Sequence, residues 1–200
     1  MKPYFELIKP RVTFAALATT LLGFWIAGGT HEESTALFFA LLGALLVGAG
    51  ANSLNQFLEQ DIDAKMRRTE ARPLPSGRLK GPQVLVFGMV TAIAGVACLT
   101  IFVHALAGFL GLVTLLSYVA LYTPLKRITP LNTFVGAFPG AMPALIGWSV
   151  STHHLNLRSG VLFLILYLWQ LPHFFAIAWI HRQDHFRSGL RMMTVGDPSG

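Results

Sequence analysis

One short stretch of the chain combines an amide, two carboxylates and several bases at a spacing that suits anion and metal chemistry. On a helix, Asn55, Glu59 and Asp63 fall at positions i, i+4 and i+8 and project from one face. Mg²⁺ takes one or two carboxylates together with phosphate oxygens, and Arg or Lys neutralises the remaining phosphate charge. Bases follow the stretch directly, at Lys65, Arg67, Arg68 and Arg72. The pattern predicts a site for a magnesium-bound diphosphate, and the alternative is the solvated end of an amphipathic helix.

The elements that must position this stretch are apolar. Hydrophobic residues make up 54% of the 200-residue chain, charged residues only 12%, and the mean hydropathy is +0.58. Such a composition is typical of a polytopic membrane protein. Six runs contain no Asp, Glu, Lys or Arg, and each is long enough to span a bilayer: 12–29, 36–57, 84–103, 106–122, 133–150 and 161–180. We therefore expect an all-α bundle of six transmembrane helices, with residues 1–200 in a single domain.

The distribution of bases predicts the orientation of the bundle. The formal net charge is +6, but the bases gather before the first run, after the second, after the fourth and after the sixth. They do not form a soluble basic domain, which argues against a nucleic-acid partner. By the positive-inside rule, the basic loops and both termini lie in the cytoplasm.

A second polar segment follows the sixth run and contains Asp184 and His185. This segment and the long connection 58–83 lie on the same predicted side, where they could clamp one diphosphate. A transporter of cations or anions is the rival class of function. Ionisable residues near midspan would favour a transporter. Here the acids lie at one membrane face, which favours an enzyme.

Polar residues also enter the membrane. For Asn52 and Ser53 we weigh helix packing and function equally, because a lipid-exposed amide would be unsatisfied. Pro139 and Pro143 in the fifth run should break that helix, with a kinked packing helix as the favoured alternative, and a pocket wall is compatible with either. His173 in the sixth run is either a hydrogen-bonded core residue or a functional contact.

Two tyrosines at i and i+4, Tyr118 and Tyr122, lie near the cytoplasmic end of the fourth run. An interfacial aromatic belt is the default interpretation. The functional alternative is that their rings face a carbocation intermediate.

These residues together resemble a known family. The arrangement Asn55-x-x-x-Glu59-x-x-x-Asp63, followed by Arg72-Pro73, is similar to the first acidic motif of the UbiA-type intramembrane prenyltransferases. Later blocks resemble the branch of that family that farnesylates haem, the haem O synthases: 122–127, 136–143, 169–174 and Asp184-x-x-x-x-Gly189-x-x-Met192. The match runs nearly end to end.

The resemblance implies that farnesyl diphosphate ionises with the help of Mg²⁺ and alkylates a vinyl group of haem B. Addition of water then gives haem O and diphosphate. A quinone precursor such as 4-hydroxybenzoate is the alternative acceptor. By match to the motifs, the residues that hold metal and diphosphate are Asn55, Glu59, Asp63 and Asp184. The implied anion partners are Lys65, Arg68, Arg72, Arg78, Lys126 and Arg127, and the implied haem-side residues are His173 and His185.

The resemblance also sets expectations for the whole protein. Family members usually have nine spans, so six of nine would be present and the chain would be incomplete at its C-terminus. The expected partners are farnesyl diphosphate, haem B and the lipid bilayer, with a haem A synthase or assembly factors of a terminal oxidase as further candidates. The expected location is the bacterial inner membrane, or the mitochondrial inner membrane in a eukaryote.

Overall fold

The computed structural model describes residues 2–191, and within this part of the chain every regular element is a helix. The predicted Met192 lies outside the described residues. The long elements are α2 (Pro10–Ile26), α3 (Ser34–Leu58), α5 (Gly81–Phe102), α6 (Ala105–Leu116), which continues through η2 (Ser117–Tyr122) into α7 (Thr123–Ile128), α8 (Asn132–Thr152) and α9 (Leu157–Ile180). The short elements are α1 (Lys2–Leu7), η1 (His31–Glu33), α4 (Gln60–Asp63) and α10 (Arg182–Ser188).

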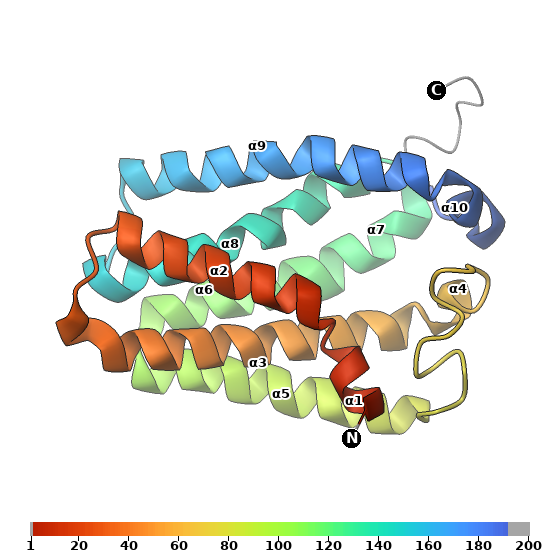
Figure 1. The fold of residues 1–200 in the computed structure, drawn as a ribbon, viewed down its shortest axis with the longest axis horizontal. Coiled ribbons are helices and arrows are strands. Elements are labelled where there is room, and N and C mark those ends of the chain that lie inside the picture. The colour runs from red at the N-terminus through yellow and green to blue at the C-terminus, as the bar shows by residue number, and fades with distance from the viewer. Residues whose placement is uncertain (1, 192–200) are drawn as a thin grey trace.

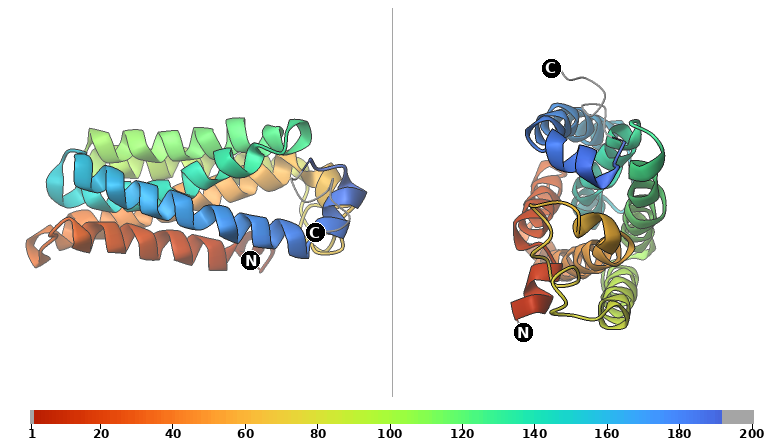
Figure 2. Two further views of the ribbon diagram at one scale, coloured as in Figure 1. Left: turned by 90° about the horizontal axis from the view of Figure 1, so that it is seen from above. Right: turned by 90° about the vertical axis from the view of Figure 1, so that its right-hand side faces the viewer.

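The predicted all-α membrane bundle is confirmed. Five helical segments in the described part of the chain are long and apolar enough to cross a membrane, and α2 is a shorter apolar helix of 17 residues. The six helices run side by side, with α9 along one edge and α5 along the opposite edge (Figures 1 and 2). Figure 1 shows α4, α10 and the end of α7 together at one end of the bundle, which we call the polar end.

Glycines let the helices approach closely. A Cβ added at Gly50 of α3 would lie 2.6 Å from the backbone nitrogen of Ala92 in α5, and one at Gly95 would lie 2.6 Å from the nitrogen of Val47. Small residues at such contacts are typical of membrane helices, whose association depends on close packing. The α3–α5 pair therefore forms a fixed unit that carries the acidic stretch at its end.

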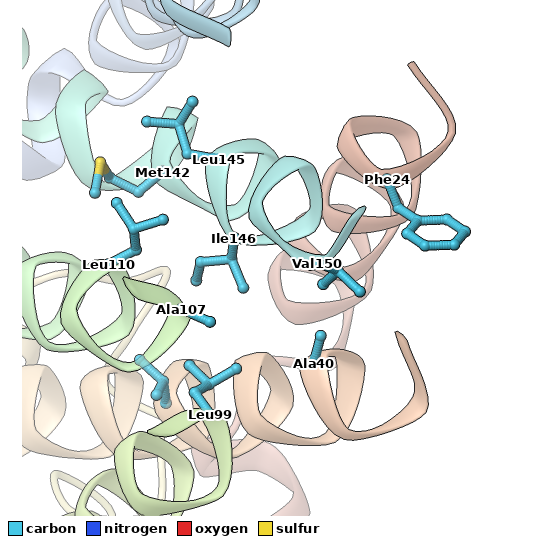
Figure 3. Close-up of a cluster of buried hydrophobic side chains, with 10 residues drawn as sticks. Phe24, Ala40, Leu99, Ala107, Leu110, Met142, Leu145, Ile146 and Val150 are labelled. Atoms are coloured by element: carbon cyan, nitrogen blue, oxygen red, sulfur yellow. The ribbon is translucent and has the colours of Figure 1, made fainter. Parts of the chain in front are cut away.

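The apolar core lies between α8 and its neighbours. Leu99, Leu110 and Ile146 point toward one another from α5, α6 and α8 (Figure 3). In α8, 78% of the membrane-span window is buried, whereas in α9 the value is 11%. Our expectation of a break at Pro139 and Pro143 is wrong, because α8 is one helix from Asn132 to Thr152. Neighbouring helices enclose it, and such packing tolerates proline inside a membrane helix.

Candidate functional site

The acidic stretch lies at the polar end, where α3 stops. The expected continuous helix is interrupted, since α3 ends at Leu58 and α4 begins at Gln60. The helical hydrogen bonds persist across this interruption: the Glu59 amide donates to the Asn55 carbonyl at 3.0 Å, and the Asp63 amide donates to the Glu59 carbonyl at 2.8 Å. Asn55, Glu59 and Asp63 are all buried. The sequence spacing therefore places these side chains in one region despite the change of helix.

Two of the predicted anion partners are ion-paired to the buried acids. Lys126 Nζ lies 2.8 Å from Glu59 Oε1, and Arg72 Nη1 lies 2.6 Å from Asp63 Oδ2. Carboxylates at the C-terminal end of a helix meet its negative dipole, so bases are needed there. The long connection after α4 folds back to supply Arg72, and the Thr69 hydroxyl fixes this fold by donating to the Asp63 carbonyl at 2.8 Å.

Asn55 contacts Lys9, one of the bases before the first apolar run, for which the sequence predicted only a role in orientation. Its amide oxygen accepts a hydrogen bond from Lys9 Nζ at 3.0 Å, and its amide nitrogen donates to the Thr123 hydroxyl at 3.1 Å. Lys9 lies in the link between α1 and α2 and Thr123 begins α7, so three separate parts of the chain meet at Asn55. The sequence feature that could have pointed to Lys9 is its position directly before Pro10, at the start of the first span.

The backbone at Lys9 is unusual and is held by α3. Lys9 has a φ of 48°, in the left-handed region that few residues other than glycine adopt. The carbonyls beside it would lack helical partners. They accept instead from side-chain amides of α3, Gln56 to Leu7 at 2.8 Å and Asn52 to Ile8 at 3.2 Å. Asn52, for which packing and function were equal alternatives, therefore serves packing in this structure.

Charge around Lys9 is uneven. Burial, together with the nearby Arg72 and Lys126, lowers the pKa of Lys9 to about 7, against the opposing effect of Glu59 and Asp63. Among the described residues, its hydrogen-bond acceptor is the neutral Asn55 amide and no carboxylate pairs with it. The site therefore holds one sheltered basic group without its own anion, and an arriving anion would favour the ammonium form of this group.

A π-helical turn shapes the wall formed by η2 and α7. The Tyr118 carbonyl accepts from the Thr123 amide, which is the i to i−5 bond of a π-helix, and also from the Thr123 hydroxyl at 2.9 Å. Pro124, which lacks an amide hydrogen, follows this turn. Lys126 Nζ lies 4.5 Å above the centre of the Tyr122 ring, and the Tyr118 and Tyr122 rings lie 5.5 Å apart. Both predicted tyrosines therefore adjoin the charged cluster. Whether they face a carbocation stays a prediction.

α10 supplies the second predicted motif. Arg68, in the connection after α4, is close enough to both Asp63 and Asp184 for their charges to act on it. His185 is buried, and burial together with Arg68 lowers its pKa to about 4, so its imidazole is neutral at pH 7. The Arg191 amide donates to the Lys126 carbonyl at 2.9 Å, which fastens the segment after α10 to α7.

Other predicted residues lie outside this cluster. Arg78 pairs with Glu6 and Arg127 pairs with Asp61, in both cases at 2.6 Å and exposed, and Lys65 is exposed. His173 stacks on Trp169 on an exposed part of α9, with the ring centres 5.6 Å apart, whereas His185 belongs to α10. The structure therefore separates the two predicted haem-side histidines into different surroundings.

The acids can be tested for their fit to Mg²⁺. Among the described residues, no three His, Cys, Asp or Glu side chains converge as a ready metal site. Within the same residues, however, Asp63 Oδ1 is buried without a hydrogen-bond donor, and Glu59 Oε1 is buried against Lys126 Nζ. Hard cations prefer such anionic oxygens, and Mg²⁺ completes its shell with water and phosphate rather than with protein alone. Two carboxylates beside an amide fit this requirement, and the predicted role of Asp184 in holding the metal stays a prediction.

The chain is similar to known prenyltransferases. The model of the UbiA prenyltransferase family matches residues 16–198. Proteins named protoheme IX farnesyltransferase are similar over nearly the whole chain. The one from Solibacter usitatus is 42% identical over 99% of this chain and 71% of its own length. The one from Koribacter versatilis is 40% identical over 100% and 66%, and the mitochondrial one from Arabidopsis thaliana is 38% identical over 98% and 46%.

Solved structures show the same fold. A UbiA homologue from Archaeoglobus fulgidus bound to DMAPP and Mg²⁺ has a TM-score of 0.79 and 14% identity over 97% of this chain and 69% of its own. A structure of digeranylgeranylglyceryl phosphate synthase has a TM-score of 0.79 and 19% identity over 98% and 69%. This likeness concerns the arrangement of helices alone.

Proposed function

The chain belongs to the UbiA prenyltransferase family, and we propose that the protein transfers a farnesyl group from farnesyl diphosphate to a vinyl group of haem B. Water addition at the alkylated vinyl group then gives haem O, with diphosphate as the second product. The predicted family and its haem branch are confirmed by relatives that are 38–42% identical. The chain spans 46% to 71% of the length of these relatives, so the activity and substrates of the whole protein are proposals.

One observation carries the proposal: buried acids and a surplus of bases meet at the polar end of an apolar bundle. Glu59 and Asp63 provide two carboxylates, while Lys126, Arg72 and Lys9, which has no carboxylate partner among the described residues, provide three basic groups. A surplus of sheltered positive charge favours binding of an anion, and a diphosphate bears several negative charges. The apolar helices beyond the site suit a farnesyl tail.

The chain's own residues would act on the leaving group. Lys126 and Arg72 would stabilise the negative charge that collects on the diphosphate as its bond to the farnesyl carbon breaks, which is electrostatic stabilisation by groups fixed in advance. Asp63 and Glu59, with Asn55, would hold Mg²⁺. When bound, Mg²⁺ would neutralise phosphate oxygens and so assist ionisation.

The same end of the bundle would shelter the cation formed from farnesyl diphosphate. The Tyr118 and Tyr122 rings line the cluster beside Lys126, and aromatic ring faces stabilise positive charge. Burial limits the access of water, which would otherwise capture the cation before haem does. Of the two predicted haem-side histidines, His185 lies beside this cluster and presents a neutral imidazole.

The protein is a multi-pass membrane protein, and its orientation is part of the proposal. The end of α7 and the connections that follow α3 and α9 meet at the polar end and hold most of the bases. By the positive-inside rule, this end and both termini would face the cytoplasm of a bacterial inner membrane. Labelling of single cysteines placed at Lys65 and Arg187 with an impermeant reagent tests this, since both should react only after cell lysis.

Product formation tests the reaction. Membranes that contain the chain are incubated with haem B, farnesyl diphosphate and Mg²⁺, and haem O is measured by mass spectrometry. We expect haem O with the unchanged chain and none with Asp63→Asn. Arg158→Gln, an exposed change in α9 far along the bundle from the polar end, is the control. Prenylation of 4-hydroxybenzoate with no haem O would contradict the haem assignment.

A further inference from the structure

We propose that Lys9 is an additional cation of the diphosphate site, held on the Asn55 amide oxygen before substrate arrives and transferred to the diphosphate when a divalent cation takes its place on that oxygen. Lys9 would thereby keep the Asn55 side chain oriented in the empty site. This inference rests on the proposed function, because it assigns Lys9 to the same diphosphate.

The first support is the contrast among the bases at the acidic stretch. Lys126 and Arg72 each contact a carboxylate at 2.8 Å or less, whereas Lys9 contacts a neutral amide oxygen at 3.0 Å. A sheltered cation without an anion is costly, and an arriving anion repays that cost. Lys9 is therefore the base of this group that has the most to gain from a diphosphate.

The second support is the backbone that carries Lys9. A left-handed lysine is a costly conformation, and it persists only where the surroundings determine it. Here two amides of α3, from Asn52 and Gln56, hold the carbonyls of Ile8 and Leu7. The chain therefore uses buried hydrogen bonds to keep the Lys9 side chain directed at Asn55, although a simple link between two helices needs no such conformation.

The third support is competition for one oxygen. The Asn55 amide nitrogen is fixed by Thr123 at 3.1 Å, so the amide cannot turn over, and its oxygen stays directed at the site. That oxygen accepts a hydrogen bond from Lys9 Nζ, whereas Asp63 Oδ1 has no hydrogen-bond donor among the described residues. A divalent cation that also uses the Asn55 oxygen must compete with Lys9, so the two bind that oxygen in alternation.

Alternation predicts effects of opposite sign for Lys9→Met, which keeps the length of the side chain and removes its charge. Mn²⁺ serves as the probe of the metal site, followed by electron paramagnetic resonance without substrate. Farnesyl thiolodiphosphate, which resists ionisation, serves as the probe of the diphosphate site, followed by calorimetry with Mg²⁺. We expect Lys9→Met to bind Mn²⁺ several-fold more tightly and the thiolodiphosphate about tenfold more weakly, the effect of one charged hydrogen bond.

Arg11→Met is the matched control, because it removes an exposed positive charge two positions away on α2. It should change neither affinity by more than about twofold, as expected for a solvent-screened charge. The purified full chain is used in lipid nanodiscs, and circular dichroism checks that each variant is folded.

Three outcomes would overturn the inference. If the unchanged chain fails to bind the thiolodiphosphate, the proposed function is overturned and this inference with it. If the unchanged chain binds but Lys9→Met matches it on both probes, only the role of Lys9 is overturned. Weaker binding of both probes would mean that Lys9 merely supports the structure around Asn55, which also overturns the inference.

Discussion

The polar end contains two kinds of ion pair that use the same chemistry in different surroundings. The inner pairs are Glu59–Lys126 and Asp63–Arg72, whose acidic side chains are only 7% and 1% exposed. The outer pairs are Asp61–Arg127 and Glu6–Arg78, whose acidic side chains are 54% and 43% exposed. Glu59 and Asp63 form inner pairs, whereas Asp61, which lies between them in the sequence, forms an outer pair.

The outer pairs fasten loops over the site. Arg127 donates to both oxygens of Asp61 and to the Leu58 carbonyl, which joins α7 to the end of α3. Arg78 donates to both oxygens of Glu6, which joins the connection after α4 to α1. Such forked contacts fix geometry, but water screens them. The two kinds of pair therefore differ in their dielectric surroundings. Substitutions in the inner pairs should have larger effects than substitutions in the outer pairs.

The largest effect is expected from Asp63→Asn, in an inner pair. The change removes a hard anionic oxygen that would bind Mg²⁺, although the volume is kept. Loss of a charge-assisted contact worth roughly 3 kcal/mol in binding corresponds to about 100-fold, so Mg²⁺-dependent affinity for farnesyl diphosphate should fall by about that factor. Calorimetry measures it, with Arg158→Gln as control. An equal loss of affinity in both variants would point to misfolding, and the inner pairs would then have no special role in binding.

A smaller effect on the inner cluster is expected from Gly136→Ala. The added Cβ would lie 2.4 Å from the Tyr122 ring, so the ring must shift, and this disturbs its contact with Lys126. Loss of this cation–π contact is worth about 0.5–2 kcal/mol, which predicts a decrease of several-fold in haem O formation. Gly160→Ala is the control, because nothing lies within 4 Å of its Cβ. Similar decreases in both variants would separate Tyr122 from the activity.

A still smaller effect is expected from Asp61→Asn, in an outer pair. Exposed pairs of this kind contribute about 0.2–1 kcal/mol to stability. The melting temperature should therefore fall slightly, while affinity for farnesyl diphosphate stays within about threefold of the unchanged chain. Thermal unfolding and calorimetry on one preparation measure both. A loss of affinity as large as that of Asp63→Asn would mean that Asp61 belongs to the site.

The smallest effect is expected from Glu6→Gln, which removes the carboxylate of an exposed pair. Arg78 holds the pKa of Glu6 below its usual value, so the pair is present at pH 7. Raising the salt concentration from 50 mM to about 500 mM should remove any difference in melting temperature between Glu6→Gln and the unchanged chain, because salt screens exposed charges. A difference that survives high salt would show that the pair acts like an inner one.

Much of the molecule follows from local pattern. Charge-free runs of sufficient length require membrane helices, because backbone groups in a bilayer must bond within their own segment. The spacing of Asn55, Glu59 and Asp63 places them in one region, and it survives the interruption at Glu59 because the i to i−4 hydrogen bonds are kept. The gathering of bases at alternate loops likewise anticipates a single polar end, at which α4, α7 and α10 meet.

The tertiary structure decided which of the polar residues act together. Sequence alone could not divide the bases into inner and outer ones, since Lys126 and Arg127 are adjacent yet pair with Glu59 and Asp61 in opposite surroundings. It could not bring Lys9 to Asn55 across 46 positions, because that contact depends on how α3 holds the link between α1 and α2. Hydrophobic periodicity records which residues are buried in the membrane, whereas the pairing of charges depends on long-range packing that sets distance and dielectric surroundings.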